Sequence, residues 1–102
     1  MPRLIALYDV PADPEVFDAH YRDIHTPIVD RYPNLREVRL TKPRGVGGQP
    51  APYHLMAEMR FDSDADLQEA LGSDAGRESA KDLRNFAQAG VTLFVAPDEA
   101  DG

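Results

Sequence analysis

Strand-like segments that are apolar on both faces constrain this sequence more than any other feature. Side chains alternate between the two faces of a β-strand, so a sheet with one wet face shows a regular apolar–polar alternation. Residues 3–9, 53–61 and 91–96 instead carry apolar side chains at both sets of positions. One set includes Tyr8, Leu55 and Ala57, and the other includes Ile5, Leu7, Met56 and Phe94. Two helices can cover only one face, so we expect the second face to meet another copy of the chain.

Helix signals stand between these strands. Asp13 is a good N-cap, and Pro14 suits the first helical position. The helix should break near Thr26, because the residue before Pro27 avoids the helical region of backbone space. Residues 63–66 form a capping box that predicts the start of the second helical region.

The remaining segments complete a known order of elements. Residues 35–42 alternate polar and apolar side chains and predict a strand near a sheet edge. Glycine and proline in residues 44–52 predict a flexible hairpin loop, and residues 97–102 predict a frayed acidic tail. The order is strand, helix, strand, strand, helix, strand. It predicts one α+β domain over residues 1–102 with a ferredoxin-like fold, in which a four-stranded antiparallel sheet carries the helices on one face.

Composition excludes several classes of function. The chain has 102 residues and no cysteine, which excludes a disulfide scaffold, a thiolate nucleophile and a cysteine-ligated metal. Its formal net charge of -7 argues against nucleic acid and anionic membranes as partners, because both require clustered basic residues. No apolar run approaches the roughly 20 residues of a membrane span, and no signal-peptide cleavage site follows the apolar N-terminal segment. We therefore expect a cytoplasmic protein.

A candidate site lies on the first helix. Phe17, Tyr21 and His25 are spaced by four residues and share one helix face, with His25 at its inner end. A partly buried histidine titrates near neutrality and can give or take a proton. The alternative role for His25 is a hydrogen bond to a backbone carbonyl at the helix end. The other candidate proton donors are Tyr8, Tyr21, Tyr32 and Tyr53, and such aromatic walls suit an apolar or aromatic ligand.

The other two histidines have less specific roles. His20 should lie at the rim of the helix interface. His54 is one residue away from the apolar row of its strand, which places it toward the dimer side, with the pocket as the alternative. His20 and His25 are five residues apart and should diverge around an α-helix, and no HxH or HxxxH spacing occurs. We therefore expect neither a metal site nor a cofactor.

Two motifs resemble the EthD family of the dimeric α/β-barrel superfamily. The pattern F-x-x-[HY][YW]-x-x-x-H-x-P occurs between Phe17 and Pro27, and residues 82–86 match a weaker D-L-x-x-F pattern near the last strand. The resemblance implies two protomers joined through their sheets into a barrel, with a pocket between helices and sheet in each. It also implies that His25 is the pocket histidine. Tyr21 stands where tryptophan is frequent in that family, so the substrate stays open.

Related barrel proteins include cofactor-free monooxygenases, lactone isomerases, polyketide cyclases and haem-degrading enzymes. The resemblance therefore implies a catabolic, oxidoreductase-like role for this chain on a small apolar or aromatic compound. His25 would act as general acid or base, while Tyr8 or Tyr53 polarises a substrate oxygen. Two alternatives remain at this point. One is a non-catalytic binding or accessory protein, and the other is a haem protein with His25 as axial ligand.

Overall fold

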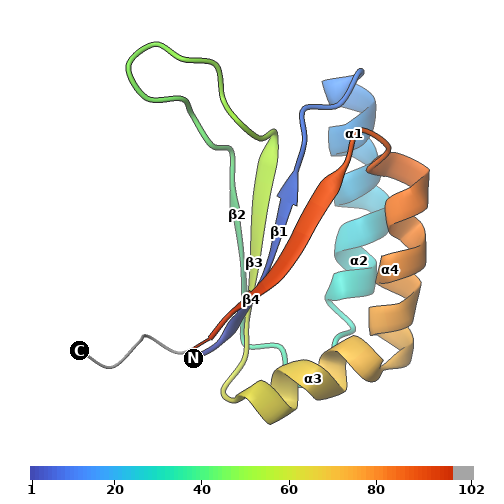
Figure 1. Cartoon of the computed structure of the whole chain (residues 1–102). Helices are drawn as coiled ribbons and strands as arrows, with labels where there is room; N and C mark the ends of the chain where they lie inside the picture. The colour runs from blue at the N-terminus through green and yellow to red at the C-terminus, as the bar shows by residue number, and fades with distance from the viewer. Residues whose placement is uncertain (98–102) are drawn as a thin grey trace.

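The computed structural model describes residues 1–97, so the predicted acidic tail lies outside the described residues beyond Pro97. Its sheet has four strands in the order β2-β3-β1-β4, and every neighbouring pair is antiparallel. The strands are β1 (Arg3–Tyr8), β2 (Glu37–Thr41), β3 (Leu55–Arg60) and β4 (Val91–Ala96). The helices lie on one side of the sheet: α1, α2 and α4 run along its face, and α3 crosses below its end (Figure 1). The predicted ferredoxin-like α+β fold is confirmed.

Capped helices begin where the sequence predicts them. The first helical rod consists of α1 (Pro14–His20), the π-helical turn η1 (Tyr21–His25) and α2 (Thr26–Val29). The second region consists of α3 (Asp64–Gly72) and α4 (Asp74–Phe86). The Asp13 carboxylate accepts a hydrogen bond from the backbone of Val16, and Ser63 and Ser73 cap α3 and α4 in the same way.

The predicted break near Thr26 is wrong. Thr26 keeps helical backbone angles, and its N–H donates to the carbonyl of Tyr21, five residues earlier. Pro27 has no N–H, and its ring would crowd the carbonyl four residues before it in a regular α-helix. The wider π-helical turn relieves this crowding without interrupting the rod. Such turns occur frequently at functional sites.

The strand register divides the sheet faces as the sequence predicts. Leu4, Ala6 and Tyr8 of β1 lie opposite Met59, Ala57 and Leu55 of β3, and all six are buried under the helices. On the other face, Leu7 pairs with Met56, and Ile5 pairs with Phe94. The core is therefore a single apolar layer between the two central strands and the helices.

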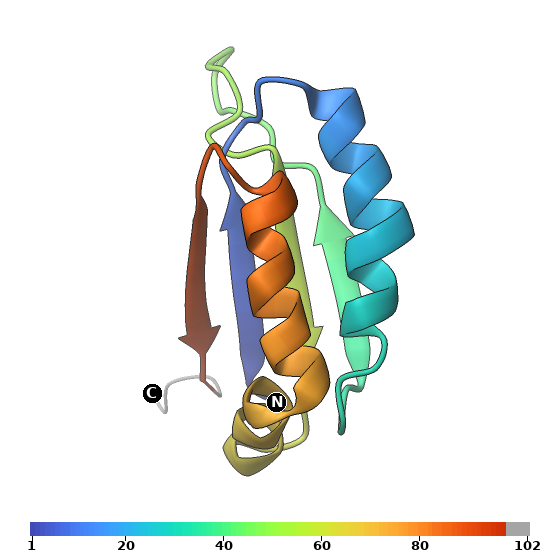
Figure 2. The ribbon, with the colours of Figure 1, turned by 90° about the vertical axis from the view of Figure 1, so that its right-hand side faces the viewer.

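The helices cover the centre of the sheet and leave its edges open. Figure 2 looks onto the helices and shows β4 to one side of α4, without a helix over it. Leu93 and Val95 on the helix-facing row of β4 are exposed, as is Leu40 on β2. The expectation that helices would cover one entire face is therefore too simple.

The β2–β3 connection is a long loop. Residues 42–54 contain no strand and project past the end of the sheet (Figure 1). Tyr53, predicted to begin the third strand, lies in this loop, and β3 begins at Leu55.

None of the helices in residues 1–97 is long and apolar enough to cross a membrane.

The contact between α3 and α4 depends on Gly76. A Cβ atom at this position would lie 2.3 Å from the carbonyl oxygen of Ala70 and 2.6 Å from that of Leu71. Gly76→Ala gains about 1 kcal/mol of helix propensity, but it must push backbone atoms apart, which costs about 1–3 kcal/mol. We expect a net loss of unfolding free energy, measured by urea denaturation. Gly72→Ala is the matched control, because a Cβ there meets nothing within 4 Å. Equal stability of the two variants would contradict the close packing.

Candidate functional site

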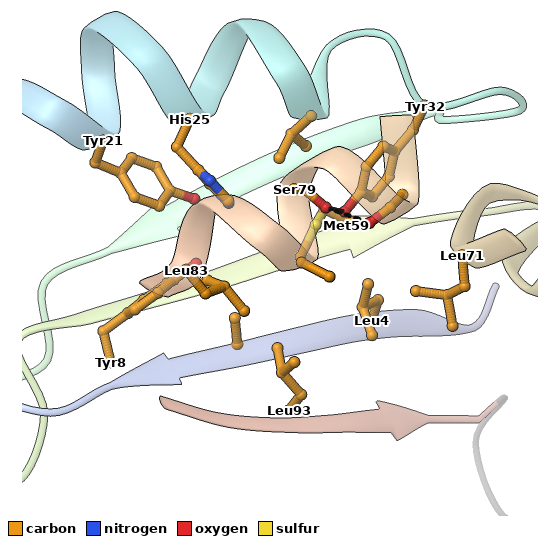
Figure 3. Close-up of a pocket in the computed structure, with 14 residues that line it drawn as sticks. Leu4, Tyr8, Tyr21, His25, Tyr32, Met59, Leu71, Ser79, Leu83 and Leu93 are labelled. Atoms are coloured by element: carbon orange, nitrogen blue, oxygen red, sulfur yellow. Dashed lines mark hydrogen bonds between the residues drawn. The ribbon is translucent and has the colours of Figure 1, made fainter. Parts of the chain in front are cut away.

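A small cavity lies between the helices and the helix-facing side of the sheet. Its volume is about 80 Å³. Its walls come from β1, β3, β4, the first helical rod, α3 and α4 (Figure 3). Aspartate, glutamate, lysine and arginine are absent from this lining. The polar groups in the walls are those of Tyr8, Tyr21, His25, Tyr32 and Ser79.

His25 brings an oriented imidazole to the cavity wall. The side chain is buried, with 4% of the residue's surface exposed, and its Nδ1 atom lies 2.9 Å from Oδ2 of Asp82. An ionised carboxylate can only accept hydrogen bonds, so Nδ1 carries the proton and Nε2 keeps a free lone pair. Among residues 1–97, Nε2 makes no hydrogen bond, and no side-chain nitrogen or oxygen in these residues is both buried and without a partner, so Nε2 is not sealed off. The free nitrogen is therefore available to a molecule in the cavity.

The π-helical turn places a second histidine on the same carboxylate. His20 precedes the turn and His25 ends it, and Nε2 of His20 lies 2.8 Å from Oδ1 of Asp82. In a regular α-helix, residues five apart would point in different directions, which is what the sequence predicts. That prediction is wrong, because the wider turn brings both imidazoles to the same side of the rod.

Hydrogen bonding fixes the charge states of this cluster. Burial acts to raise the pKa of Asp82, but hydrogen bonds from Asn85, His25 and His20 outweigh it and lower the pKa. Burial lowers the pKa of His25, and the opposing effect of the Asp82 carboxylate does not restore it. At neutral pH the cluster is therefore an ionised carboxylate that holds a neutral imidazole.

Phenol groups supply the proton donors of the cavity. Burial raises the pKa of Tyr8 and of Tyr21, whose rings meet edge-on with centroids 5.6 Å apart. The ring of Tyr21 lies 5.2 Å from that of His25. The Ser79 hydroxyl donates to a backbone carbonyl at 2.9 Å, so Tyr32 is the donor in their short mutual hydrogen bond. Every tyrosine in the wall is therefore protonated at neutral pH, next to a neutral base.

Three of the predicted site residues lie together in this wall: Tyr8, Tyr21 and His25. Phe17 lies behind them with its ring edge-on to Tyr8 at 5.3 Å, and it does not line the cavity. Tyr53 is half-buried in the loop before β3 and is also absent from the lining.

The predicted direction of His54 is wrong. Its Nε2 atom lies 2.8 Å from Oδ1 of Asp18, and its ring meets Phe17 edge-on at 5.0 Å. These contacts place His54 against α1, on the helix side of the sheet. It lies outside the cavity and away from the proposed dimer face.

Sequence reasoning named Tyr32 only as a candidate proton donor, and it missed Asp82 and Ser79 as site residues. Asp82 and Ser79 are three residues apart on α4, and Phe86 follows Asp82 by four, so all three share the buried face of that helix. The sequence places Asp82 and Ser79 on the same helix face as Phe86. Polar residues on a face that is otherwise apolar could have indicated a site there. No cluster of three histidine or acidic residues with metal-binding geometry occurs within residues 1–97.

Known proteins resemble this chain over nearly its whole length. A family model described as the EthD domain matches residues 10–90. The crystal structure of an EthD family protein from Bacillus halodurans is 36% identical, with a TM-score of 0.90, and the match covers 97% of this chain and 99% of that one. An uncharacterised 11.0 kDa protein from the thcB–thcC intergenic region of Rhodococcus erythropolis is 34% identical over 99 residues. That match covers 97% of this chain and 96% of the relative.

A more distant solved structure shares the fold. SnoaB from Streptomyces nogalater, described as a cofactor-independent oxygenase, has a TM-score of 0.71 and 13% identity. The match covers 98% of this chain and 94% of that one. At this level of identity the likeness concerns the fold alone.

The buried imidazole makes stability depend on pH. Burial holds the pKa of folded His25 below its unfolded value of about 6.5, so the unfolded state binds the proton more readily. The free energy of unfolding should therefore fall as the pH drops below about 6.5. His25→Asn keeps an N–H donor for Asp82 but cannot titrate. Urea denaturation at pH 7.5 and 5.5 should show a smaller loss in this variant than in wild type. Equal losses would mean that His25 is not held neutral by burial.

Proposed function

The chain belongs to the EthD family, and we propose that it is a cofactor-independent enzyme in which His25 removes a proton from a small, largely apolar compound. The observation that carries this proposal is the 2.9 Å hydrogen bond between Nδ1 of His25 and Asp82. It fixes the tautomer in which the cavity-facing nitrogen is the basic one. A base whose partner carboxylate orients it is the recurring arrangement for proton transfer in enzymes.

Asp82 has two tasks in this reaction. It holds the imidazole ring in place, and it stabilises the imidazolium that forms when Nε2 takes the proton. Because Asp82 is buried with His25, little water screens the attraction between them. His20 and Asn85 donate to the same carboxylate and keep it in position and ionised. We assign Asp82 as a positioning residue that acts through His25.

The tyrosine hydroxyl groups can stabilise negative charge on an oxygen of the substrate. When a C–H bond next to a carbonyl loses its proton to Nε2, the electron pair moves onto the carbonyl oxygen as an enolate. A phenol substrate would place the same negative charge on its own oxygen. The hydroxyl of Tyr21, protonated and close to His25, can donate a hydrogen bond to that oxygen. A carbonyl or phenol compound therefore fits both the base, His25, and the hydrogen-bond donor, Tyr21.

The alternative roles differ in what they require of the cavity. A non-catalytic binding protein would use the same apolar walls without proton transfer, and the exchange experiment below separates the two. A porphyrin is far larger than about 80 Å³, so haem binding at His25 would require the helices to move away from the sheet. We therefore prefer the acid–base role.

We also propose that the protein acts as a homodimer through the outer face of its sheet. Ile5, Leu7, Met56 and Phe94 form an apolar area on this face; Ile5 is already buried in the single chain, Leu7 and Met56 are half-buried, and Phe94 is 43% exposed. Sheet-to-sheet pairing of two copies would bury this area, which a soluble monomer rarely leaves open. The face of β2 on the same side is polar, so the apolar contact is confined to the other three strands.

Proton exchange tests the proposed chemistry without requiring that the natural substrate be known. Wild-type protein should accelerate exchange of the α-hydrogens of phenylacetone and acetophenone with deuterated water, measured by NMR. The rate should fall as the pH drops, because protonated His25 cannot accept a proton. His25→Asn should lose this acceleration, and Asp82→Asn should reduce it about 10²–10⁴-fold.

The matched control for Asp82→Asn is Glu78→Gln. Glu78 lies one turn earlier on α4, is exposed and pairs with Arg31, so its loss should leave the exchange rate unchanged. Wild-type exchange in His25→Asn would remove His25 from the mechanism. Binding of these ketones without faster exchange would support the non-catalytic role instead.

Light scattering at micromolar concentration tests the dimer. Wild type should have the mass of two chains, and Phe94→Asp should give single chains, because it places a charge in the apolar contact. Val16→Asp is the control: Val16 is also an exposed apolar residue, but it lies on α1, where an acid in the first turn is tolerated. A monomeric wild type, or a dimeric Phe94→Asp variant, would refute the proposed face.

A further inference from the structure

We propose that the compound bound in the cavity is an amphiphile whose apolar tail leaves the cavity along the open edge strand β4. Its polar head, a phenol or carbonyl oxygen, would lie between His25 and Tyr21. Its tail would pass Leu93 and rest against Val95. The identity of the head rests on the proposed function, whereas the path of the tail follows from the shape and exposure of the site.

The cavity lining combines buried site residues with leucines that reach solvent. His25 and Tyr21 are buried, whereas Leu71 and Leu93 belong to the lining and are also exposed to solvent. Figure 3 shows the rings of Tyr21 and His25 beside the first helical rod. Leu4, Leu71 and Leu93 lie away from these two rings. The exposed leucines therefore mark the mouth through which a ligand would extend.

An apolar strip continues outward from this mouth. Leu93 and Val95 stand on the helix-facing row of β4, and they pair across β1 with Ala6 and Leu4. Both of these partners line the cavity. No helix covers β4 in Figure 2. We call the exposed row formed by Leu93 and Val95 the β4 strip.

The size of the cavity requires such an exit. About 80 Å³ encloses only a few heavy atoms, against roughly 300–1,000 Å³ for sites that bury a whole drug-sized ligand. A larger compound must leave most of its atoms outside. The exposed part of the lining includes the leucine side chains Leu71 and Leu93, so an apolar tail fits the mouth. The outer-face dimer does not cover the β4 strip, because the strip belongs to the opposite face of the sheet.

A series of para-alkylphenols tests this proposal. The probes are phenol, para-ethylphenol, para-butylphenol and para-hexylphenol, with dissociation constants measured by isothermal titration calorimetry. Full burial of a methylene tightens binding about fourfold, so a tail that is wet on one side should gain about twofold per methylene. A flat series in wild type, or no binding by any member, would overturn the proposal.

Two variants locate the tail. Leu93→Asn should leave the affinity for phenol near that of wild type and remove most of the gain with chain length. Val95→Asn should act only on the longest tails, because Val95 lies beyond the cavity lining. The matched control is Leu40→Asn. Leu40 is 48% exposed on the helix-facing row of the other edge strand, as Leu93 is 52% exposed on β4, and its replacement should leave the series unchanged.

The readouts separate this inference from the proposed function. Loss of proton exchange in His25→Asn concerns the head group and does not depend on tail length. If exchange requires His25 but the phenol series is flat, the proposed function stands and the tail proposal fails. If Leu93→Asn changes the mass by light scattering instead of the chain-length series, the β4 strip is an interface between copies, which also overturns the tail proposal.

Discussion

The buried carboxylate of Asp82 is the constraint on which the arrangement of this protein depends. An ionised group inside a protein is tolerated only when hydrogen bonds replace its lost hydration. Here His20, His25 and Asn85 all donate to it. The bonds join α4 to the first helical rod, so the pairing that satisfies the charge also fixes how the two helices lie against each other.

The π-helical turn makes this pairing possible. Both imidazoles must reach one carboxylate from the same rod, and a regular α-helix would separate them. Pro27 requires a wider turn just before it, and the same turn brings His20 and His25 to one side. Phe86 then packs against both imidazole rings, at centroid distances of 4.9 and 4.8 Å. A backbone irregularity and an apolar contact therefore hold the base in a single orientation.

Different parts of the sheet lie in three different environments. Its central strands lie under the helices and form the core and the floor of the cavity. Its outer face carries the apolar area that we assign to the dimer. The helix-facing row of β4 meets solvent, because the two helical regions are together narrower than the sheet. In our proposals, the narrow helical layer leaves an apolar path from the cavity to solvent, which the tail of the ligand would follow.

Local patterns in the sequence determined much of this fold. The alternation of side chains predicted which strand residues face the helices, and the caps at Asp13 and Ser63 predicted where the helices begin. The spacing of Tyr21 and His25 placed both on the inner face of one helix. These are properties of short stretches of backbone, in which a period of two or of about four residues directly gives the direction of a side chain.

Only the tertiary structure decided how the site is assembled. The bonds of Asp82 to His25 and His20 join residues 57 and 62 positions apart, and no local period relates them. The direction of His54 depends on the neighbouring Asp18, and the exposure of Leu93 depends on the width of the helical layer. Each follows from where separate elements come to rest against one another. That is why the sequence could place a histidine at a pocket but could not provide the carboxylate that makes it a base.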